Sequence, residues 1–366
     1  MSNELAPLTT LRVGGPAARL VSATTRDEVV AAALEAWGSV DELLVLGGGS
    51  NVVIADDGFD GTVVRIATRG IARLADADGP HPFRLRVEAG EPWDDVVAFA
   101  VEQGLGGIEA LSGIPGTTGA APIQNIGAYG EQLSETLVAI DFLDYETGEI
   151  ERLEASELGL GYRTSSLKQG RQGVVLAIEL GFVQPDGLSA PVGYDQLAST
   201  LDVSTGTRVP LADARAAVLA LRASKGMVLD PADPDSVSAG SFFTNPIVSE
   251  SFARGLPAEA PRWPLDPDEA PNILPLGAEI PAAPASGEYL VKLSAAWLIE
   301  RSGIPRGFGL PGSGAGISSK HTLAIVNRGG ATAADIAELA RFIQMRVLSE
   351  FGVELQPEPV LVGVQL

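Results

Sequence analysis

Ser241 lies in surroundings that suggest a chemical role, within the run Ser238-Ala-Gly-Ser-Phe-Phe-Thr-Asn-Pro246. A serine hydrolase places its nucleophile in Gly-x-Ser-x-Gly and needs a histidine as the base. Here Phe242 follows Ser241, and the chain contains only two histidines, His81 and His321. The pattern therefore disfavours a serine nucleophile. Two interpretations remain: a serine that donates a proton or a hydrogen bond, and a serine that caps a turn.

Two glycine-rich segments could place backbone N–H groups against a phosphate. Gly47-Gly-Gly-Ser-Asn51 follows a short apolar run, and the segment Gly113–Gly130 contains five glycines and two prolines. Glycine allows a close approach of the backbone, and successive N–H groups form anion-binding concavities. Neither segment has the spacing of a Rossmann fingerprint or a P-loop. A structural turn and a plain connection between strands remain the alternatives.

Composition excludes several classes of protein. The chain has no cysteine and two histidines, so disulfides, thiolate nucleophiles and multi-histidine zinc sites are excluded, and we expect no metal. The net charge of -22, without a basic block, argues against a nucleic-acid partner. The N-terminus lacks the pattern of a secretory signal, and no apolar run reaches the roughly 18 residues of a membrane helix. We therefore expect a cytoplasmic protein with no membrane partner.

The 366 residues suggest two or three domains. Apolar periodicity and capping signals predict a mixture of helices and strands joined by long loops, which is typical of an α+β fold. A proline-rich segment with eight prolines, residues 254–287, is predicted to be a surface loop. The predicted helices are 26–37, 93–103, 211–224 and 333–351. The predicted strands are 42–46, 52–54, 62–66, 84–88, 137–144, 150–153 and 174–183.

Taken together, the motifs of this chain resemble the UDP-N-acetylenolpyruvoylglucosamine reductase family, also called UDP-N-acetylmuramate dehydrogenases. The matching stretches occur in the family's order along essentially the whole chain. The segment Val192-Gly-Tyr-Asp-Gln196 contains Tyr194. It resembles the tyrosine loop of the subclass in which this loop covers the substrate. The other matches are Thr10-Leu-Arg-Val-Gly-Gly15, Leu46–Asn51, Gly113-Ile-Pro-Gly116, Pro122-Ile-Gln-Asn-Ile-Gly-Ala-Tyr-Gly130, Gly161-Tyr-Arg163, Gly240-Ser-Phe-Phe-Thr-Asn-Pro246 and Gln356-Pro-Glu358.

The resemblance implies three domains. Residues 1–68, with the segment 352–366 returning to them, and residues 69–224 would form a two-domain FAD-binding module of the vanillyl-alcohol-oxidase type. Residues 225–351 would form an α/β substrate-binding domain. FAD would be held without a covalent bond, NADPH would be the co-substrate, and the protein is expected to be a monomer.

The resemblance also implies roles for individual residues. Ser241 would be the proton donor, while Arg163 and Glu358 would stabilise an enol or enolate intermediate. The expected substrate contacts are Tyr129, Tyr194, Lys225 and Asn245. The chain departs from the family pattern by extra residues between Lys225 and Ser241, and by Lys320-His321 where some members carry glutamine. The expected FAD contacts are Gly47, Gly48, Gly49, Ser50, Asn51, Ile114, Pro115, Gly116, Gly119, Ala120, Gln124, Asn125, Gly127 and Ala128.

The implied reaction is the NADPH-dependent reduction of UDP-N-acetylglucosamine enolpyruvate to UDP-N-acetylmuramate in peptidoglycan precursor synthesis. One alternative is another FAD-dependent oxidoreductase of the same fold, which oxidises an alcohol with O₂ as acceptor. The glycine-rich segments would suit that enzyme equally well, but the segment 240–246 and Glu358 would then be unexplained. A second alternative is a non-catalytic protein that binds a nucleotide sugar.

Overall fold

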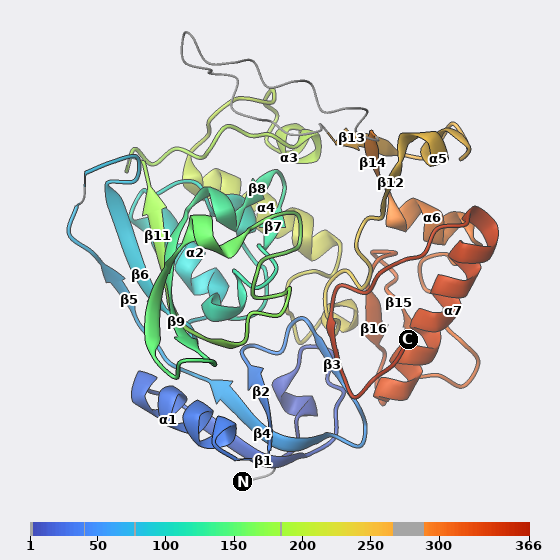
Figure 1. Ribbon diagram of the computed structural model, residues 1–366. Helices are drawn as coiled ribbons and strands as arrows, with labels where there is room; N and C mark the ends of the chain where they lie inside the picture. Colours follow the sequence, from blue (N-terminus) through green and yellow to red (C-terminus); the bar gives the residue numbers. More distant parts are fainter. Residues whose placement is uncertain (1–2, 40, 77, 184, 266–288) are drawn as a thin grey trace, which may run out of the picture.

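The structure, a computed structural model, describes residues 3–39, 41–76, 78–183, 185–265 and 289–366. Helices and strands alternate without a regular βαβ series, which confirms the predicted α+β class. Figure 1 shows a larger body that contains the N-terminal two thirds of the chain, and a lobe formed by α5, α6 and α7 with their strands. Among the described residues, no helix is long and apolar enough to cross a membrane.

The N-terminal part of the body is a small parallel sheet covered by one helix. Strands β1 (Ala17–Ala23), β4 (Phe59–Ile66) and β2 (Glu42–Leu46) lie side by side in that order. Helix α1 (Arg26–Trp37) begins with the predicted capping box, in which Thr25 accepts from the Glu28 N–H and the Glu28 side chain accepts from the Thr25 N–H. Strand β2 leads into the loop that begins at Gly47, and this loop lies next to the rest of the body.

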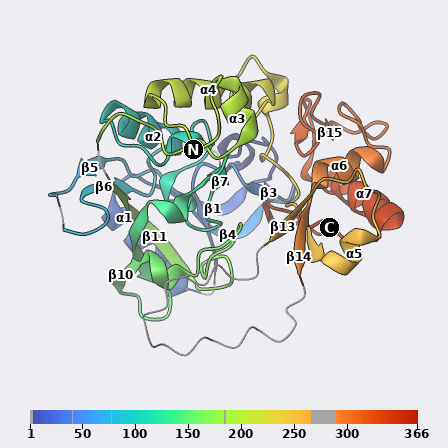
Figure 2. The ribbon, with the colours of Figure 1, turned by 90° about the horizontal axis from the view of Figure 1, so that it is seen from above.

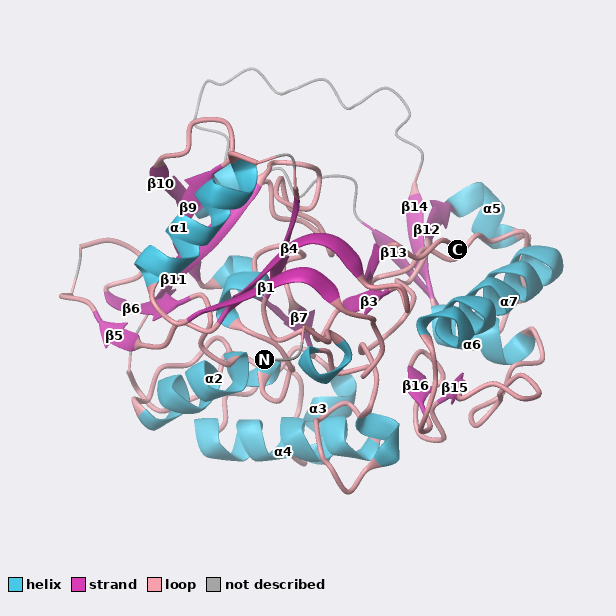
Figure 3. Ribbon diagram, turned by 90° about the horizontal axis from the view of Figure 1, so that it is seen from below, coloured by secondary structure: helices cyan, strands magenta, loops and turns pink. Residues whose placement is uncertain are grey.

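The second sheet is antiparallel and forms the centre of the body. Its order is β10 (Ile150–Glu154), β9 (Leu137–Asp144), β11 (Gly173–Phe182), β6 (Phe83–Glu88) and β5 (Ile71–Arg73). Nearly every residue of β11 is buried, because helix α1 contacts it and two other strands flank it. Figure 3 shows α1 on one side of the strands, and α2 (Trp93–Glu102), α3 (Asp195–Thr200) and α4 (Leu211–Ser224) on the other.

The remaining lobe has its own apolar core, in which α7 (Ala333–Phe351) packs against α6 (Ala295–Arg301). Figure 2 shows this lobe beside the body, with α5 (Glu250–Arg254) at its outer side. Its strands form a three-stranded and a two-stranded antiparallel sheet. They are β12 (Ile247–Ser249), β14 (Leu290–Leu293), β13 (Arg262–Leu265), β15 (Ala315–Ile317) and β16 (Ile325–Asn327).

Strand β13 corrects the prediction that residues 254–287 contain no regular structure. It pairs antiparallel with β14, and it includes Pro264. The order β12-β14-β13 places it at the edge of its sheet, where a proline costs no hydrogen bond inside the ladder. The density of prolines concealed this strand in the sequence. Residues 266–287 of the predicted loop lie outside the described residues.

The C-terminal segment returns to the N-terminal part of the chain. Strand β17 (Val360–Val362) pairs in parallel with β3 (Val52–Ile54), and the Val360 N–H donates to the Asn51 carbonyl at 3.0 Å. Figure 1 shows this C-terminal strand crossing from α7 to β3. Glu358, two residues before β17, is thereby placed next to the loop that follows β2.

A second contact between distant segments is made at the start of α7. The Asp56 carboxylate accepts from the Ala333 N–H at 2.7 Å and from the Ala334 N–H at 3.0 Å. The first N–H groups of a helix have no partner within the helix, and they favour a negative charge. Asp56 thus fastens the first turn of the lobe's long helix to the N-terminal part of the body.

We predict that Asp56→Ala lowers the free energy of unfolding by about 1–2 kcal/mol, the usual cost of a lost helix cap. Urea unfolding followed by circular dichroism measures the change. Asp57→Ala is the matched control, because Asp57 is also exposed and its side chain does not cap the helix. Equal stabilities of the two variants would contradict the role given to Asp56.

Candidate active site

A cavity of about 560 Å³ lies where the N-terminal sheet, the central body and the lobe meet. Its wall includes the loop after β2, the glycine-rich segment 114–129, the start of β11 and the end of α4. The lobe contributes Gly240, Ser241 and His321, and the C-terminal segment contributes Glu358. Residues from all parts of the chain therefore face one volume.

One end of the cavity is formed by two glycine segments in close contact. A Cβ atom on Gly48 would lie 2.7 Å from the Gly116 Cα, so a side chain at this position would clash. Among the described residues, no hydrogen bond uses the N–H groups of Gly48, Gly49 or Ser50 as donors. These N–H groups are free to bind the oxygens of a diphosphate.

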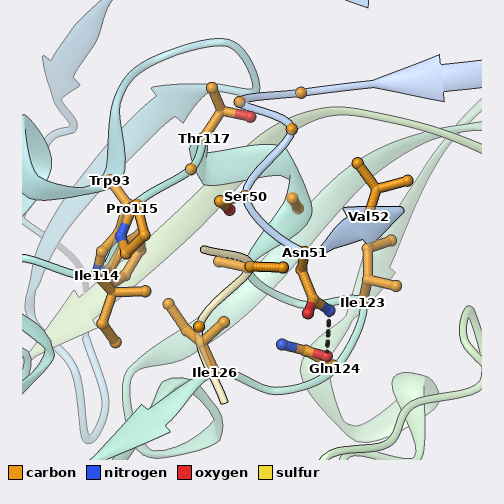
Figure 4. Close-up of a pocket in the computed structure, with 18 of the residues that line it drawn as sticks. Ser50, Asn51, Val52, Trp93, Ile114, Pro115, Thr117, Ile123, Gln124 and Ile126 are labelled. Carbon is orange, nitrogen blue, oxygen red and sulfur yellow. Dashed lines mark hydrogen bonds between the residues drawn. The ribbon is translucent and has the colours of Figure 1, made fainter. Parts of the chain in front are cut away.

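Beside these glycines the wall is largely apolar. Figure 4 shows Trp93, Ile114, Pro115, Ile123 and Ile126 arranged around the pocket. Trp93 is rigidly held, because its indole N–H donates to the Leu111 carbonyl at 3.1 Å and its ring is 1% exposed. Flat apolar walls next to unused backbone donors suit a molecule with a fused ring system at one end and a diphosphate beyond it. The residues present thus fit FAD.

A chain of polar contacts runs from the glycine loop to Glu358. The Asn51 amide donates to Gln124 Oε1 at 2.9 Å, a contact drawn in Figure 4, and to the Glu358 carbonyl at 3.3 Å. The Gln124 amide in turn donates to Glu358 Oε1 at 3.4 Å. The pairing of β17 with β3 makes this chain possible, since it brings residues far apart in the sequence together.

Arg163 forms an ion pair with Glu358, with 3.2 Å between Nε and Oε1. Its Nη atoms also donate to the carbonyls of Gly127 at 2.7 Å and Asn125 at 3.4 Å. Asn125, Tyr129 and Arg163 all adopt left-handed backbone conformations, with φ between 46° and 53°. Such conformations are strained in residues with side chains, and their concentration is typical of functional sites.

Burial raises the pKa of Glu358, while the positive charges of Arg163 and Lys168 oppose this shift. The effect of burial is the larger one, because little water reaches the carboxylate to solvate its charge. The Glu358 carboxyl therefore keeps its proton to a higher pH than a glutamate in water does.

At the other end of the cavity two tyrosines meet. The rings of Tyr129 and Tyr194 pack edge to face, with their centroids 5.7 Å apart. Lys225 Nζ lies 5.4 Å from the Tyr129 ring centroid and donates to Gln196 Oε1 at 2.9 Å. Burial lowers the pKa of Lys225, and the charge of Arg222 lowers it further. Aromatic faces beside cationic groups suit a ligand with a ring and negative charges.

Two buried aromatic residues follow Ser241 and anchor its backbone in the core of the lobe. Phe242 and Phe243 are each 1% exposed, and the Glu358 N–H donates to the Phe242 carbonyl at 2.9 Å. Thr10 adds a contact to the preceding turn, because its hydroxyl donates to the Ser238 carbonyl at 2.6 Å and its N–H to the Gly49 carbonyl. The serine is therefore held relative to both Glu358 and the glycine loop.

The structure places nineteen of the predicted site residues on the wall of this cavity and leaves Asn125 and Asn245 off it. Asn125 is buried, and its amide donates to the Gly161 carbonyl at 3.1 Å, in the turn before Arg163. Asn245 accepts from the Ala295 N–H at 3.0 Å. The residues on the wall are Gly47, Gly48, Gly49, Ser50, Asn51, Ile114, Pro115, Gly116, Gly119, Ala120, Gln124, Gly127, Ala128, Tyr129, Arg163, Tyr194, Lys225, Ser241 and Glu358.

Several wall residues were missed by the motif analysis, and Arg222 is the most informative of them. It is 8% exposed, its Nη2 donates to the Met227 carbonyl at 2.9 Å, and its Nε has no partner among the described residues. Among these residues no carboxylate forms an ion pair with it. Arg222 appeared in the sequence only as part of an amphipathic helix, although its position three residues before Lys225 is a usable signal.

His321 also lies on the wall, near the same cations. Burial and the charges of Lys225 and Arg222 lower its pKa to about 4. The imidazole is therefore neutral at neutral pH. Trp93 and Lys168 are further wall residues that no motif singled out.

Comparison with known proteins agrees with this geometry. The family described as "FAD binding domain" matches residues 17–154, and the family described as "UDP-N-acetylenolpyruvoylglucosamine reductase, C-terminal domain" matches residues 231–362. The curated UDP-N-acetylenolpyruvoylglucosamine reductase of Leifsonia xyli is 62% identical, over 99% of this chain and 98% of its own length. The curated reductase of Saccharopolyspora erythraea is 53% identical, over 100% of this chain and 96% of its own length.

The chain belongs to the UDP-N-acetylenolpyruvoylglucosamine reductase family. The crystal structure of the reductase from Thermus caldophilus agrees, with a TM-score of 0.61 and 25% identity. The superposed region covers 98% of this chain and 97% of the Thermus caldophilus chain. The family resemblance seen in the sequence is thereby confirmed, as is FAD as the cofactor. Among the described residues, no group of acidic or histidine side chains is arranged to hold a metal ion.

We predict that Gly48→Ala weakens FAD binding about tenfold or more, because an added methyl group must displace the segment around Gly116. The ratio of flavin to protein absorbance, measured after gel filtration, gives the occupancy. Gly255→Ala is the control, since that glycine ends α5 with an ordinary helical backbone. An unchanged flavin content in Gly48→Ala would show that the two glycine segments can separate without loss of FAD.

Proposed function

We propose that this protein reduces UDP-N-acetylglucosamine enolpyruvate to UDP-N-acetylmuramate with NADPH, through bound FAD, in peptidoglycan precursor synthesis. The observation that carries the proposal is the convergence of Ser241 with the Arg163–Glu358 ion pair on the cavity that fits FAD. A flavin oxidase acting on an alcohol would need a base for its substrate hydroxyl. It would have no use for a half-buried arginine paired with a carboxyl of raised pKa.

FAD, when bound, supplies the transfer of hydride from NADPH to C3 of the enolpyruvyl group. Electron density then moves through C2 into the substrate carboxylate, so negative charge collects on its oxygens. Arg163 would stabilise this charge, because a guanidinium stays protonated and offers parallel N–H donors. Its contacts with the carbonyls of Gly127 and Asn125 hold it in place before substrate binds. A donor aimed in advance at developing charge typically contributes about 3–4 kcal/mol.

Ser241 would donate the proton that C2 receives. A serine hydroxyl is a weak acid, but a carbanion-like carbon is a strong base, and the two can exchange a proton over a short contact. Glu358 would complete the arrangement by holding the Arg163 guanidinium in place through their ion pair. The three groups thus divide the work of charge stabilisation and proton transfer.

Tyr129, Tyr194 and Lys225 would bind the nucleotide sugar at the other end of the cavity. Lys225 would contact the diphosphate, for which its position beside Arg222 makes it suited. Asn245 and Asn125 would act through neighbours and not by direct contact. Asn245 holds the start of α6, and Asn125 holds the turn before Arg163.

We also propose the domain division on which this assignment rests. Residues 1–68 with 352–366, and residues 69–224, would form the FAD-binding module of the vanillyl-alcohol-oxidase type, and residues 225–351 the substrate-binding domain. The pairing of β17 with β3 supports the return of the C-terminal segment. A cytoplasmic monomer that binds small molecules and no nucleic acid is consistent with the net charge of -22.

Ser241→Ala is expected to slow oxidation of the reduced flavin by the enolpyruvyl substrate about 10²–10⁴-fold, the usual contribution of a general acid. Reduction of the flavin by NADPH should be nearly unchanged, because that half-reaction needs no proton on carbon. Anaerobic stopped-flow absorbance measures both half-reactions separately.

Ser241→Cys is the matched variant, since its thiol can still donate a proton and should restore part of the rate. If both half-reactions slow equally in Ser241→Ala, the serine has a structural role. If the wild-type flavin ignores NADPH but reacts rapidly with oxygen, the reductase function itself is wrong, and the oxidase alternative gains support.

We propose that Arg222 also binds the diphosphate. Arg222→Met is then expected to weaken binding of UDP about 10–100-fold, through loss of a charge-assisted hydrogen bond. The free energy of unfolding without ligand should not fall, since the substitution removes a buried cation that has no carboxylate partner in the described part of the chain. Isothermal titration calorimetry and urea unfolding give the two quantities.

Arg215→Met is the matched control on the same helix. Arg215 donates to both oxygens of Asp94, at 2.7 and 2.8 Å, so its loss should lower stability. Its effect on UDP binding should be small, because Arg215 is not on the wall of the cavity. The proposed role of Arg222 would be wrong if both variants had the same effects.

A further inference from the structure

Helix α3 reaches a cation of the cavity through one polar side chain, that of Gln196. Lys225 Nζ donates to Gln196 Oε1 at 2.9 Å. The cavity wall includes Lys225 and does not include Gln196. The glutamine therefore stands behind a residue that a ligand would touch, and its contact with Lys225 plays no part in the function proposed above.

The segment 188–201, which contains α3, is fastened at its base and along its apolar side. At the base, the Val192 N–H donates to the Thr207 carbonyl at 3.0 Å. On the apolar side, Leu197 is 3% exposed and belongs to one cluster with Val218 of α4. Figure 3 shows α3 beside α4. None of these four residues is on the cavity wall, so the bond between Gln196 and Lys225 links α3 directly to the ligand site.

The same ammonium group also touches the other segment that carries a tyrosine. Lys225 Nζ lies 5.4 Å from the ring centroid of Tyr129. Tyr129 lies in the turn between β7 (Gly127–Ala128) and β8 (Glu131–Gln132). Tyr194, the cap residue of α3, packs edge to face on Tyr129. The contacts thus form a closed ring through the lysine, the two tyrosines and the glutamine, and a ligand that binds the lysine acts on both segments.

A glutamine suits this position because its carbonyl group is neutral. In the described part of the chain, Lys225 forms no ion pair with a carboxylate, and Gln196 uses one of the three N–H donors of its ammonium group. The amide oxygen therefore fixes the direction of the ammonium group without cancelling its charge. A carboxylate in the same place would compete with the phosphates of a ligand for that charge.

We propose that Gln196 is a positioning residue that holds the Lys225 ammonium group toward the cavity and couples a bound diphosphate to α3. The proposal rests on the function proposed above, in which Lys225 contacts the diphosphate. When the phosphates bind Lys225, the ammonium group keeps its bond to Gln196, so α3 and Tyr194 are held more firmly over the ligand. Diphosphate binding and the position of the tyrosine are thereby linked.

The first test measures UDP binding to the FAD-loaded protein by isothermal titration calorimetry. Gln196→Met should weaken binding about 3–10-fold, the usual effect of one lost hydrogen bond. Gln196→Glu should weaken it about tenfold further, because the carboxylate neutralises Lys225 and repels the phosphates. Ser199→Ala is the matched control on α3, since Ser199 is exposed and its side chain forms no hydrogen bond among the described residues. Wild-type affinity in both Gln196 variants, or equal weakening in the two, would overturn the proposal.

A double-mutant cycle separates positioning of Lys225 from a general effect on the fold. In a Lys225→Met background, Gln196→Met should cause no further loss of UDP binding, because the two residues act as one unit. The same fold-change in both backgrounds would show that Gln196 acts independently of Lys225, and the proposed role would be wrong. Urea unfolding should give the same midpoint for Gln196→Met and the wild type, since Gln196 is exposed.

Hydrogen exchange tests the coupling to α3 directly. Addition of UDP should slow amide exchange in a peptide covering residues 194–201 of the wild type. At equal saturation with UDP, this protection should be absent in Gln196→Met and present in Ser199→Ala. Equal protection in the wild type and Gln196→Met would overturn the coupling.

These measurements use UDP as the probe and need no turnover, so the two proposals fail in different ways. A protein that shows the predicted differences in UDP binding but does not reduce the enolpyruvyl substrate would contradict the proposed function and leave the role of Gln196 standing. A protein that reduces the substrate while its Gln196 variants bind UDP as the wild type does would overturn the role of Gln196 alone.

Discussion

The pairing of β17 with β3 is the contact on which the site depends. It places Glu358 beside the glycine loop after β2, where the backbone and side chain of Glu358 accept from Asn51 and Gln124. The same segment bonds to Phe242 of the lobe, so Ser241 is located relative to Glu358. Without this pairing, the carboxyl, the serine and the glycine loop would belong to three separate parts of the chain. The return of the C-terminus is therefore a requirement of the chemistry as much as of the fold.

Groups that cost stability are concentrated around this contact. Arg222 is a buried cation whose Nε has no partner in the described structure, and Glu358 is a half-buried carboxyl of raised pKa. Asn125, Tyr129 and Arg163 have left-handed backbone conformations. Each feature opposes folding, so each needs support from the surrounding packing. The large cores of the body and the lobe, which bury Trp93, Phe242 and Phe243 nearly completely, supply that support.

Local signals in the sequence predicted much of the fold, and the reasons can be given residue by residue. Helix α1 has a capping box and a terminal glycine, and α4 and α7 have clear apolar periodicity, so their bounds agree with the structure. Strand β13 was missed because Pro264 concealed it, and only pairing with β14 reveals that it is an edge strand. The α+β class followed from the order of elements, but the β17–β3 pairing depends on contacts between the two ends of the chain.

The site illustrates the same limit. Motifs indicated the glycine segments, Arg163, Ser241 and Glu358, because their residue types are distinctive in the family. They could not separate residues on the cavity wall from residues that act behind it, such as Asn125. Nor did they indicate Arg222, whose burial without a carboxylate partner among the described residues becomes visible only in the structure. In a protein of net charge -22, exposed charges beyond about 8 Å are largely screened, so an anionic ligand responds mainly to the nearby cations. Arg163, Lys168, Arg222 and Lys225 share one cavity, and this local grouping overrides the charge of the whole chain.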